Sequence, residues 1–588
     1  FASIVRPGVH VIRVDGPAEV IVPGRALHPP RVLSTEMVSE ESGPPEMVTI
    51  ASTRGVIVSA AEQSVTDADE TRTMTRLVAT AAAPLTSTRD AARSDVEHSC
   101  RELLAEVLSC GVDALLAEHE AAWSRLWDDV AIDIGGDAEL QRAVRLAQFH
   151  LITSSDGGTE AAIGARGMTG PSYRGHVFWD ADVFVVPALS AMSPARARAA
   201  VRYRWNRLDA ARRRAAAEGR RGARFPWESA LGGDEVTPTE GRDLHGDVVA
   251  IRTGQLEEHI VADVAWAVVN HVHWTGDDAF MADMGAEILL ETARYWQSRV
   301  DVDGDGSGHI RHVIGPDEYH EDVDDNAFTN AMACWNLTAA AEVCERLGLG
   351  EPSEWSDWRN TGDRLVDGFD AASGVHEQFA GYFDLDPVLA ASLGDPPIPA
   401  SALLGHERIA QVQIIKQGDV AMMHHLIPDA VPLGSLGADL DYYLPRTAHG
   451  SSLSPPITSS LLARAGDLSE AVRWFEMSAR FDLDNLSGTT AGGVHLATMG
   501  GLWQAFTQGF LGVRPTADGL LVDPRVPASW GLVTHRFLYR SVPVRLDVSS
   551  DTFELTCPVP IEIIGPDGDR RHERRLTAVR SGREWSVA

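Results

Sequence analysis

In Val261-Ala262-Asp263-Val264-Ala265-Trp266 apolar residues recur every three or four positions, and the same spacing returns in Ile288-Leu289-Leu290-Glu291-Thr292-Ala293. This is the period of an amphipathic helix with one buried face. Such segments follow one another from about residue 138 to residue 515, and loops rich in Gly, Pro and Asp separate them. The pattern predicts a mainly α multidomain protein whose largest domain, residues 138–515, is helical.

The segments on either side of this helical part have different periods. Residues 1–92 are rich in Val, Thr, Ser, Pro and Gly with short alternating runs, which predicts an incomplete N-terminal β domain. Residues 93–137 have a helical period and are predicted to form a helical linker. Residues 516–588 contain alternating runs such as Val542-Pro543-Val544-Arg545-Leu546, which predict a small C-terminal β domain.

The composition is that of a soluble globular protein with several domains. Of its 588 residues, 44% are hydrophobic and 23% are charged, and no apolar run is as long as a membrane span. The formal charge of −33 repels polyanions, which argues against nucleic acid and against anionic membrane surfaces as partners. Any anionic substrate must therefore be held by local groups.

The cysteines and the first residues bear on the cellular setting. Five cysteines, an odd number without metal-type spacing, favour reduced thiols in a cytoplasmic protein and argue against zinc. The start, Phe1-Ala2-Ser3-Ile4-Val5, has neither an initiator Met nor the pattern of a signal peptide. We therefore expect the chain to begin inside a larger gene product.

Lys416 is the single lysine among 51 basic residues. Arginine supplies the positive charge everywhere else, so this position favours a compact ammonium over a planar guanidinium. Ile414-Ile415 before it and Gly418-Asp419 after it indicate a buried edge rather than a solvated face. Lys416 is thus a candidate site residue, and the alternative is a surface lysine left in an arginine-rich chain.

Two loops of the helical part place a tryptophan next to a carboxylate. Trp179-Asp180 and Trp227-Glu228 each combine an apolar ring face with an acceptor for hydroxyl groups, a pairing that suits a sugar. The alternative for either pair is a core tryptophan beside an acid that caps a helix.

A third loop, Gly315-Pro316-Asp317-Glu318-Tyr319-His320, presents two acids next to two hydrogen-bond donors. An acid in such a turn can have a raised pKa and protonate a leaving oxygen, although a solvated acidic turn has the same letters.

Upstream, residues 301–306 open like a calcium loop, but His312 stands where the bidentate Glu is needed. We interpret this segment as a turn and predict no metal site.

Two further loops combine small residues and hydroxyls with histidine and arginine. They are Arg446-Thr447-Ala448-His449-Gly450-Ser451-Ser452-Leu453-Ser454 and Gly488-Thr489-Thr490-Ala491-Gly492-Gly493-Val494-His495. Backbone amides, hydroxyls and cations of this kind can bind an anion. A flexible linker is the alternative for either loop taken alone.

Together these segments resemble glycoside hydrolase family 65. The resemblance lies in six blocks in a fixed order, followed by Gly501-Leu502-Trp503: RGHVFWD (174–180), FPWES (225–229), GPDEYH (315–320), IIKQGDV (414–420), HGSSLS (449–454) and GGVHLA (492–497). It covers about residue 120 to the end and is far more specific than any single motif. The family contains inverting disaccharide phosphorylases, which act on maltose, trehalose, kojibiose or nigerose, and a minority of hydrolases.

The resemblance implies an (α/α)6 barrel as catalytic domain, preceded by a β-sandwich and a helical linker and followed by a small β domain. Residues 1–92 are too few for the full sandwich, so we expect a partial one that is truncated, processed or divergent. In the family this domain also shapes the dimer, so a homodimer is an open expectation here.

Residue roles are carried over by matching positions. Glu318 matches the general acid that protonates the glycosidic oxygen. Four residues match those that hold the glucosyl ring, namely Trp179, Asp180, Lys416 and Gln417. The phosphate cradle is matched by Ser451, Ser452 and His495, with His449 close by.

The nucleophile separates phosphorolysis from hydrolysis. An inverting hydrolase needs a second carboxylate to activate water, whereas phosphate itself attacks in a phosphorylase. The loop between Leu444 and Ser454 contains no Asp or Glu, which favours phosphate. We therefore predict inverting phosphorolysis of an α-linked glucose disaccharide or α-glucoside, with inorganic phosphate as co-substrate and no cofactor.

Two alternatives remain open. A hydrolase of the same fold would take its base from elsewhere, such as Glu228, Glu235 or Asp441. A non-catalytic sugar-binding or scaffold protein is the second alternative, and the intact acid block at Glu318 argues against it. No block indicates which acceptor sugar or alcohol leaves.

Overall fold

The structure of the chain is a computed structural model that describes residues 1–21, 38–42, 46–51, 55–84, 89–155, 157–242, 246, 248–581 and 584–587. The chain forms two compact units, Phe1–Asp128 and Asp129–Ala588. These units are coarser than the four segments expected from the sequence, whose boundaries stay a prediction.

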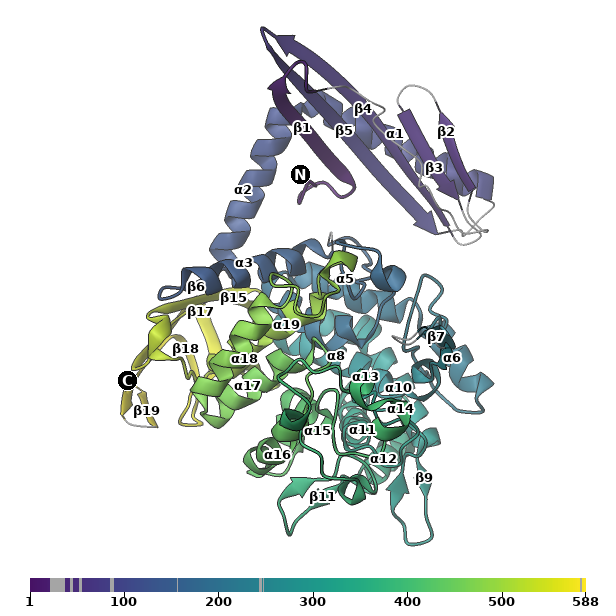
Figure 1. The fold of residues 1–588 in the computed structure, drawn as a ribbon, viewed down its shortest axis with the longest axis vertical. Coiled ribbons are helices and arrows are strands. Elements are labelled where there is room, and N and C mark those ends of the chain that lie inside the picture. Colours follow the sequence, from purple (N-terminus) through teal and green to yellow (C-terminus); the bar gives the residue numbers. More distant parts are fainter. Residues whose placement is uncertain are drawn as a thin grey trace. The chain divides into compact units, whose positions relative to one another are not determined.

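The first unit is an antiparallel sheet packed against a helix. Its five described strands lie in the order β1-β5-β4-β3-β2 (Figure 1). They are β1 (Val9–Pro17), β2 (Val38–Ser42), β3 (Glu46–Ala51), β4 (Gly55–Ala68) and β5 (Thr71–Pro84). Helix α1 (Arg89–Cys110) packs on β4 and β5, and α2 (Val112–Val130) follows.

The core of this unit joins alternate strand residues to one face of α1. Val58, Ala60 and Ala79 of the sheet share a buried cluster with Cys100 and Leu104 of the helix. Small side chains on the sheet allow the helix to approach closely. Of the two layers of the expected partial sandwich, the described residues provide one sheet, and a helix covers it.

The second unit is mainly helical, as its apolar period predicts. Its longer helices are α3 (Ala138–Thr153), α5 (Pro194–Trp205), α6 (Leu208–Ala217), α8 (Ile260–Thr275), α10 (Ala286–Arg299), α11 (Ala327–Leu347), α12 (Pro352–Gly362), α15 (Asp419–Leu426), α16 (Ser435–Tyr443), α17 (Ser454–Ala465), α18 (Leu468–Arg480) and α19 (Leu496–Gln504). Shorter ones are α4 (Val186–Met192), α7 (Thr253–Leu256), α9 (Asp278–Phe280), α13 (Ala400–Leu404) and α14 (His406–Ile409). Consecutive helices pack against each other, among them α10 with α11 and α17 with α18.

Local signals explain where these helices begin and end. The Asn326 side chain accepts a hydrogen bond from the amide of Thr329 and so caps the start of α11. Gly348 ends that helix and Gly276 ends α8, both in the left-handed conformation that glycine adopts without strain. Along α8 nearly every position is buried, since Val261, Val264 and their neighbours pack on several helices.

A sheet closes the second unit at the C-terminal end of the chain. Eight described strands belong to it, in the order β13-β14-β17-β16-β15-β6, with β18 and β19 continuing from β17. They are β6 (Ile132–Ile134), β13 (Arg514–Pro515), β14 (Leu520–Leu521), β15 (Val533–Tyr539), β16 (Val542–Val548), β17 (Thr552–Ile564), β18 (Arg570–Ser581) and β19 (Glu584–Val587). The alternation that predicts strands here is confirmed, because Val544, Leu546 and Val548 of β16 are buried.

Strand β6 comes from the segment predicted to be a helical linker. It pairs antiparallel with β15, so that Ile134 lies opposite Val533 of the C-terminal β segment (Figure 1). Ile132 and Ile134 are buried at this edge of the sheet. So short a strand cannot show a period of two, which is why the sequence does not predict it.

Among the described helices, none is both long and apolar enough to cross a membrane.

Candidate active site

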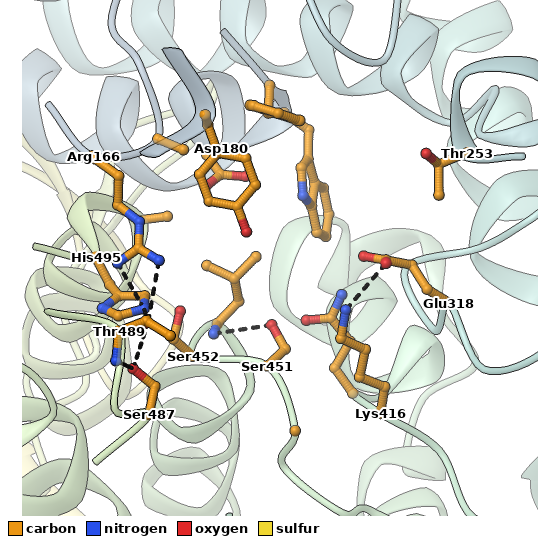
Figure 2. A pocket seen from close by; sticks show the side chains of 18 of the residues that line it. Arg166, Asp180, Thr253, Glu318, Lys416, Ser451, Ser452, Ser487, Thr489 and His495 are labelled. Carbon is orange, nitrogen blue, oxygen red and sulfur yellow. Dashed lines mark hydrogen bonds and ion pairs between the residues drawn. The ribbon is translucent and has the colours of Figure 1, made fainter. Parts of the chain in front are cut away.

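A cavity of about 870 Å³ lies in the second unit and is lined by loops from all six sequence blocks. Its lining includes every residue predicted for the site: Trp179, Asp180, Glu318, Lys416, Gln417, His449, Ser451, Ser452 and His495. Figure 2 shows Glu318 and Lys416 on one side of the view and Arg166, Thr489 and His495 on the other. The six blocks therefore converge on one place, although they are spread over most of the helical domain.

The first block enters the cavity through a backbone of unusual conformation. Tyr173, Arg174 and Gly175 have φ values of 57°, 53° and 75°, so three residues in a row are left-handed. Side chains on such a backbone cost free energy and persist where the surroundings require them, often at functional sites. The turn leads into Trp179 and Asp180, and the latter begins a π-helical segment, η2 (Asp180–Val185), ahead of α4.

The loop that carries Glu318 is tied to the start of α15. Gly315 is required there, because a Cβ at this position would clash with Oδ2 of Asp419. The Asp419 carboxylate accepts hydrogen bonds from the Asp317 amide at 2.7 Å and from Nδ2 of Asn326 at 2.6 Å. Burial raises the pKa of Asp419 to about 7, and the negative charge of Asp317 acts in the same direction.

Asp317, next to the predicted acid, joins three segments. Its carboxylate accepts hydrogen bonds from the Lys416 amide at 2.7 Å, from Nδ1 of His320 at 2.6 Å and from Nε2 of Gln378 at 3.1 Å. Because His320 also donates from Nε2 to the carbonyl of Val412, both ring nitrogens carry protons. Asp317 is thus buried and holds three segments together by hydrogen bonds, whereas the neighbouring Glu318 lines the cavity.

Lys416 and Gln417 line the cavity next to Asp317. Nζ of Lys416 lies 3.1 Å from Oε2 of Glu318, and although burial disfavours the ammonium, this carboxylate raises the pKa of Lys416. The Gln417 side chain donates from Nε2 to the carbonyl of Pro316 at 2.5 Å, which leaves its oxygen available to a ligand. A cation and an amide oxygen therefore face the space next to the acid.

Three carboxylates line the cavity among the residues described: Asp180, Glu228 and Glu318. Burial raises the pKa of Asp180 to about 7, and the charge of Glu318 adds to this effect. The structure gives the Asp180 carboxylate no side-chain partner within the described residues. It is therefore free to accept hydrogen bonds from the hydroxyl groups of a ligand.

On the other side of the cavity a guanidinium meets His495. Nη1 of Arg166 lies 2.9 Å from Nε2 of His495, and Nη2 donates to Oγ1 of Thr489 at 3.3 Å. Arginine can only donate, so Nε2 of His495 accepts and its Nδ1 carries the proton that goes to Asp482 at 2.7 Å. His495 is therefore a neutral ring oriented from behind by a carboxylate.

Ser451 and Ser452 lie just before the first turn of α17, where the helix dipole favours an anion. Pro455 and Pro456 in that turn have no N–H, so the two serine hydroxyls are the donors there. His449 precedes them with φ of 50° and stacks on Trp474 at a centroid distance of 4.0 Å. Burial lowers the pKa of His449 to about 3, and Oγ of Ser454 lies 2.8 Å from its Nδ1. His449 can thus offer a hydrogen bond to an anion but no charge.

The three carboxylates considered as a hydrolytic base differ in position. Glu228 lines the cavity, and its Oε1 lies 2.6 Å from Nδ1 of His176. Glu235 is bound by Nη1 of Arg214 at 2.7 Å and by backbone amides, and it does not belong to the lining. Asp441 is exposed on α16 outside the cavity. Only Glu228 of these three can reach a ligand.

Sequence reasoning missed Arg166 and Ser487 and included Thr489 only as one member of a loop, although all three line the cavity on the side of His495. Arg166 carried no signal because arginine is the ordinary cation of this chain. Ser487 and Thr489 lie in or beside a Gly-rich loop whose letters also suit a linker. Their assignment required the structure, which brings residue 166 within hydrogen-bond distance of residues 489 and 495.

A metal-like cluster lies elsewhere, at His376, His424 and Asp439, whose ligand atoms are all within 4.8 Å of one another. Oδ2 of Asp439 lies 2.8 Å from Nδ1 of His376 and 2.7 Å from Nε2 of His424. These are hydrogen-bond distances, so the carboxylate is satisfied by two ring N–H groups.

The calcium-like segment forms β9 (Asp301–Val302), a turn and β10 (Gly308–His309).

A carboxyl group, two indoles and a recess lined by an arginine, hydroxyls and histidines in one cavity of a helical domain fit the class of carbohydrate-processing domains. Residues 145–504 match the family model described as the glycosyl hydrolase family 65 central catalytic domain. The chain belongs to glycosyl hydrolase family 65.

Curated relatives of the chain include several phosphorylases. A kojibiose phosphorylase of Halothermothrix orenii is 36% identical over 458 residues, which are 75% of this chain and 59% of that protein. An alpha,alpha-trehalose phosphorylase of Thermoanaerobacter brockii is 32% identical over 77% of this chain and 59% of its own length. A 1,2-alpha-glucosylglycerol phosphorylase of Bacillus selenitireducens is 33% identical, over 75% of this chain and 61% of its own. The chain thus spans about three fifths of these relatives.

The fold is also that of a solved structure. A candidate kojibiose phosphorylase from the human microbiome superposes with a TM-score of 0.84, covering 97% of this chain and 82% of that one at 22% identity. At this identity the likeness bears on the fold alone.

Proposed function

We propose that this protein catalyses inverting phosphorolysis of an α-linked glucose disaccharide or α-glucoside to β-glucose 1-phosphate and the free acceptor. The observation that carries the proposal is the division of the cavity in Figure 2. One side holds a carboxylic acid, Glu318, and the other holds Arg166, Thr489 and His495. An acid facing an anion recess is what phosphorolysis needs, whereas in an inverting hydrolase a carboxylate that activates water would stand in the place of this recess.

In the proposed reaction Glu318 donates its proton to the glycosidic oxygen. The bond between that oxygen and the anomeric carbon breaks, and its electron pair stays with the departing acceptor. A phosphate oxygen forms the new bond to the anomeric carbon from the opposite face, which inverts the configuration. Trp179, Asp180, Lys416 and the oxygen of Gln417 would hold the glucosyl ring.

The anion recess would hold phosphate without needing a charged histidine. Arg166 supplies the cation and a planar pair of donors, which suit phosphate oxygens. Ser451 and Ser452 add hydroxyls at the start of α17, and the neutral rings of His449 and His495 lie beside them. This cradle keeps phosphate apart from the acid, as attack on the opposite face requires.

The relatives support the reaction class and suggest where to begin with substrates. Kojibiose, trehalose and glucosylglycerol are named in their activities. We propose an α-glucoside of this kind and place kojibiose first in any substrate panel. The acceptor itself stays open, because these relatives differ in it.

Two finer features belong to the same proposal. The paired packing of α10 with α11 and of α17 with α18 supports an (α/α)6 barrel as the arrangement of the helical domain. A homodimer is expected from the family resemblance, and sedimentation or light scattering tests it directly.

The decisive experiment incubates the protein with kojibiose, trehalose, nigerose, maltose and glucosylglycerol, with and without inorganic phosphate. Proton NMR during the first turnovers identifies the anomer of glucose 1-phosphate, and an enzymatic assay measures free glucose. We expect phosphate-dependent β-glucose 1-phosphate from one member of the panel. Free glucose formed without phosphate would instead establish a hydrolase, and Glu228→Gln would then test the member of the three proposed bases that lines the cavity.

A further inference from the structure

A second cluster of charged groups lies buried behind the two indoles of the cavity. His259 stands at the start of α8 between two carboxylates, with Nδ1 2.6 Å from Oδ2 of Asp263 and Nε2 3.0 Å from Oε2 of Glu257. The side chains of all three residues are fully buried. None of them belongs to the lining of the cavity or to the six sequence blocks.

The imidazole of His259 is held at both ends. A ring that donates from both nitrogens to carboxylates carries two protons and a positive charge. Although burial disfavours this charge, Asp263 and Glu257 raise the pKa of His259 to about 10. Rotation of the ring would break two charge-assisted hydrogen bonds at once, so its plane is fixed.

This fixed ring packs roughly perpendicular to both cavity tryptophans. Its centroid lies 4.9 Å from that of Trp179 and 5.5 Å from that of Trp227, at interplanar angles of 70° and 75°. Phe328 of α11 packs on it in the same way, at 5.3 Å and 78°. A charged imidazole packed roughly perpendicular to aromatic rings is a favourable arrangement.

Other rings also contact the two indoles. Trp179 packs on Phe184 and Phe328, and Trp227 packs on Phe178. Within the described part of the chain, the structure gives neither the Trp179 nor the Trp227 side chain a hydrogen bond, so ring packing positions both. The indoles themselves are 6.2 Å apart and tilted by 35°. His259 is the charged group that contacts both, and it joins the first sequence block to the second.

The cluster is costly as a purely structural element. Oε1 of Glu257 and Oδ1 of Asp263 are buried without a hydrogen-bond partner among the residues described. Buried carboxylate oxygens without partners lower stability, and apolar side chains would fill the same space at less cost. A costly arrangement that contacts both cavity indoles indicates a role in the site.

We propose that His259, oriented by Glu257 and Asp263, is a positioning residue that sets Trp179 and Trp227 as the surface on which the glucosyl ring binds. The assignment of that ring rests on the proposed function. The phosphate recess at Arg166 and His495 is built from other segments and does not depend on this cluster. Loss of His259 should therefore affect the sugar and leave phosphate unaffected.

The test is His259→Gln, because glutamine has a similar size but lacks a fixed ring. The matched control is His271→Gln on the same helix. His271 is also buried, with Nδ1 2.9 Å from Oγ of Ser190, and it lies outside the cavity lining. Steady-state kinetics give KM for disaccharide and for phosphate separately. Calorimetry with glucose in the absence of phosphate gives sugar affinity, and near-ultraviolet circular dichroism reports the indole environment.

For His259→Gln we expect at least a tenfold rise in KM for disaccharide and in Kd for glucose. KM for phosphate should stay within twofold, and the indole dichroism should change. His271→Gln should lower Tm with both KM values unchanged. Asp263→Asn replaces the charged acceptor at one end of the ring with a neutral amide and should shift the sugar constants in the same direction. This variant is the substitute if His259→Gln does not fold.

A folded His259→Gln protein with wild-type glucose affinity would overturn the proposal, as would equal weakening of sugar and phosphate. The glucose titration separates this inference from the proposed function. If the wild-type protein binds glucose but forms no glucose 1-phosphate, phosphorolysis fails while the positioning role is still tested by Kd.

Discussion

Nζ of Lys416 lies 3.1 Å from Oε2 of Glu318, so the single lysine of the chain is the ion-pair partner of the proposed acid. An ammonium beside a carboxylate opposes the protonation that a general acid requires. We infer that sugar hydroxyls draw the ammonium away before Glu318 acts. A compact, flexible ammonium can exchange partners in this way, whereas a guanidinium would stay bidentate on the carboxylate.

The first prediction concerns this exchange. Lys416→Arg should lower kcat/KM about 100-fold, the order of loss expected when a positioned group is displaced by about 1 Å. Initial rates with the best disaccharide measure the effect. The control is Arg408→Lys at an exposed pair with Asp386, which should leave kcat/KM unchanged. Near-normal activity of Lys416→Arg would mean that the lysine was retained by chance.

The second prediction concerns Glu318 itself. Glu318→Gln keeps the shape of the side chain but has no proton to transfer, so kcat should fall about 10² to 10⁴-fold while glucose still binds. Single-turnover formation of glucose 1-phosphate and calorimetry measure the two quantities. Glu321→Gln is the control, because Glu321 follows on the same loop outside the cavity lining. Full turnover by Glu318→Gln would remove Glu318 from the acid role.

The third prediction concerns Arg166, the cation of the anion recess. Arg166→Met should raise KM for phosphate about 10- to 100-fold, since a hydrogen bond to a charged group contributes about 1.5–3 kcal/mol. Arg166→Lys should recover part of this loss, because it restores the charge but not the planar donors. KM for disaccharide should change little. If the sugar constant changes instead, phosphate binds elsewhere in the cavity.

Arg198→Met on α5 serves as the control for this pair of variants. Its Nη1 bonds to Asp277 at 2.9 Å outside the cavity lining, so both KM values should match those of the wild type. A phosphate effect of equal size in this control would point to overall charge, and not to a phosphate ligand, as the cause.

The sequence predicted the site better than it predicted the parts around it, for physical reasons. Glu318 and Lys416 stand in short blocks of rare composition, so their letters alone single them out. Arg166 is one of many arginines, and its role depends on a contact with His495, which is remote in sequence. His259 lies at the start of α8. The apolar period of that helix predicts a buried face and gives no indication of a charged imidazole there. Strand β6 pairs with a strand of the C-terminal segment and is too short to show a period.

The last prediction uses pH. Burial raises the pKa of Asp180 from 3.8 to about 7, so below pH 7 this group is protonated in the empty cavity. An ionised carboxylate accepts hydrogen bonds from hydroxyls more strongly than a protonated one. Glucose affinity should therefore fall as pH drops below about 7, approaching tenfold per unit. Calorimetry between pH 5.5 and 8.5 without phosphate measures this dependence free of the titration of phosphate itself.

Asp180→Asn should bind glucose weakly at every pH, with a flat profile over the same range. The contribution of Asp180 to folding stability should change with pH in the direction opposite to its contribution to glucose affinity. The folded protein binds the Asp180 proton more tightly than the unfolded chain, so this group's contribution to stability falls as pH rises from about 4 through 7. Asparagine removes that loss, and Tm of the variant should exceed the wild-type value at pH 8 and approach it near pH 4. Asp209→Asn, an exposed change on α6, should alter neither profile. A wild-type glucose affinity that is independent of pH would mean that Asp180 is not the group that receives the sugar.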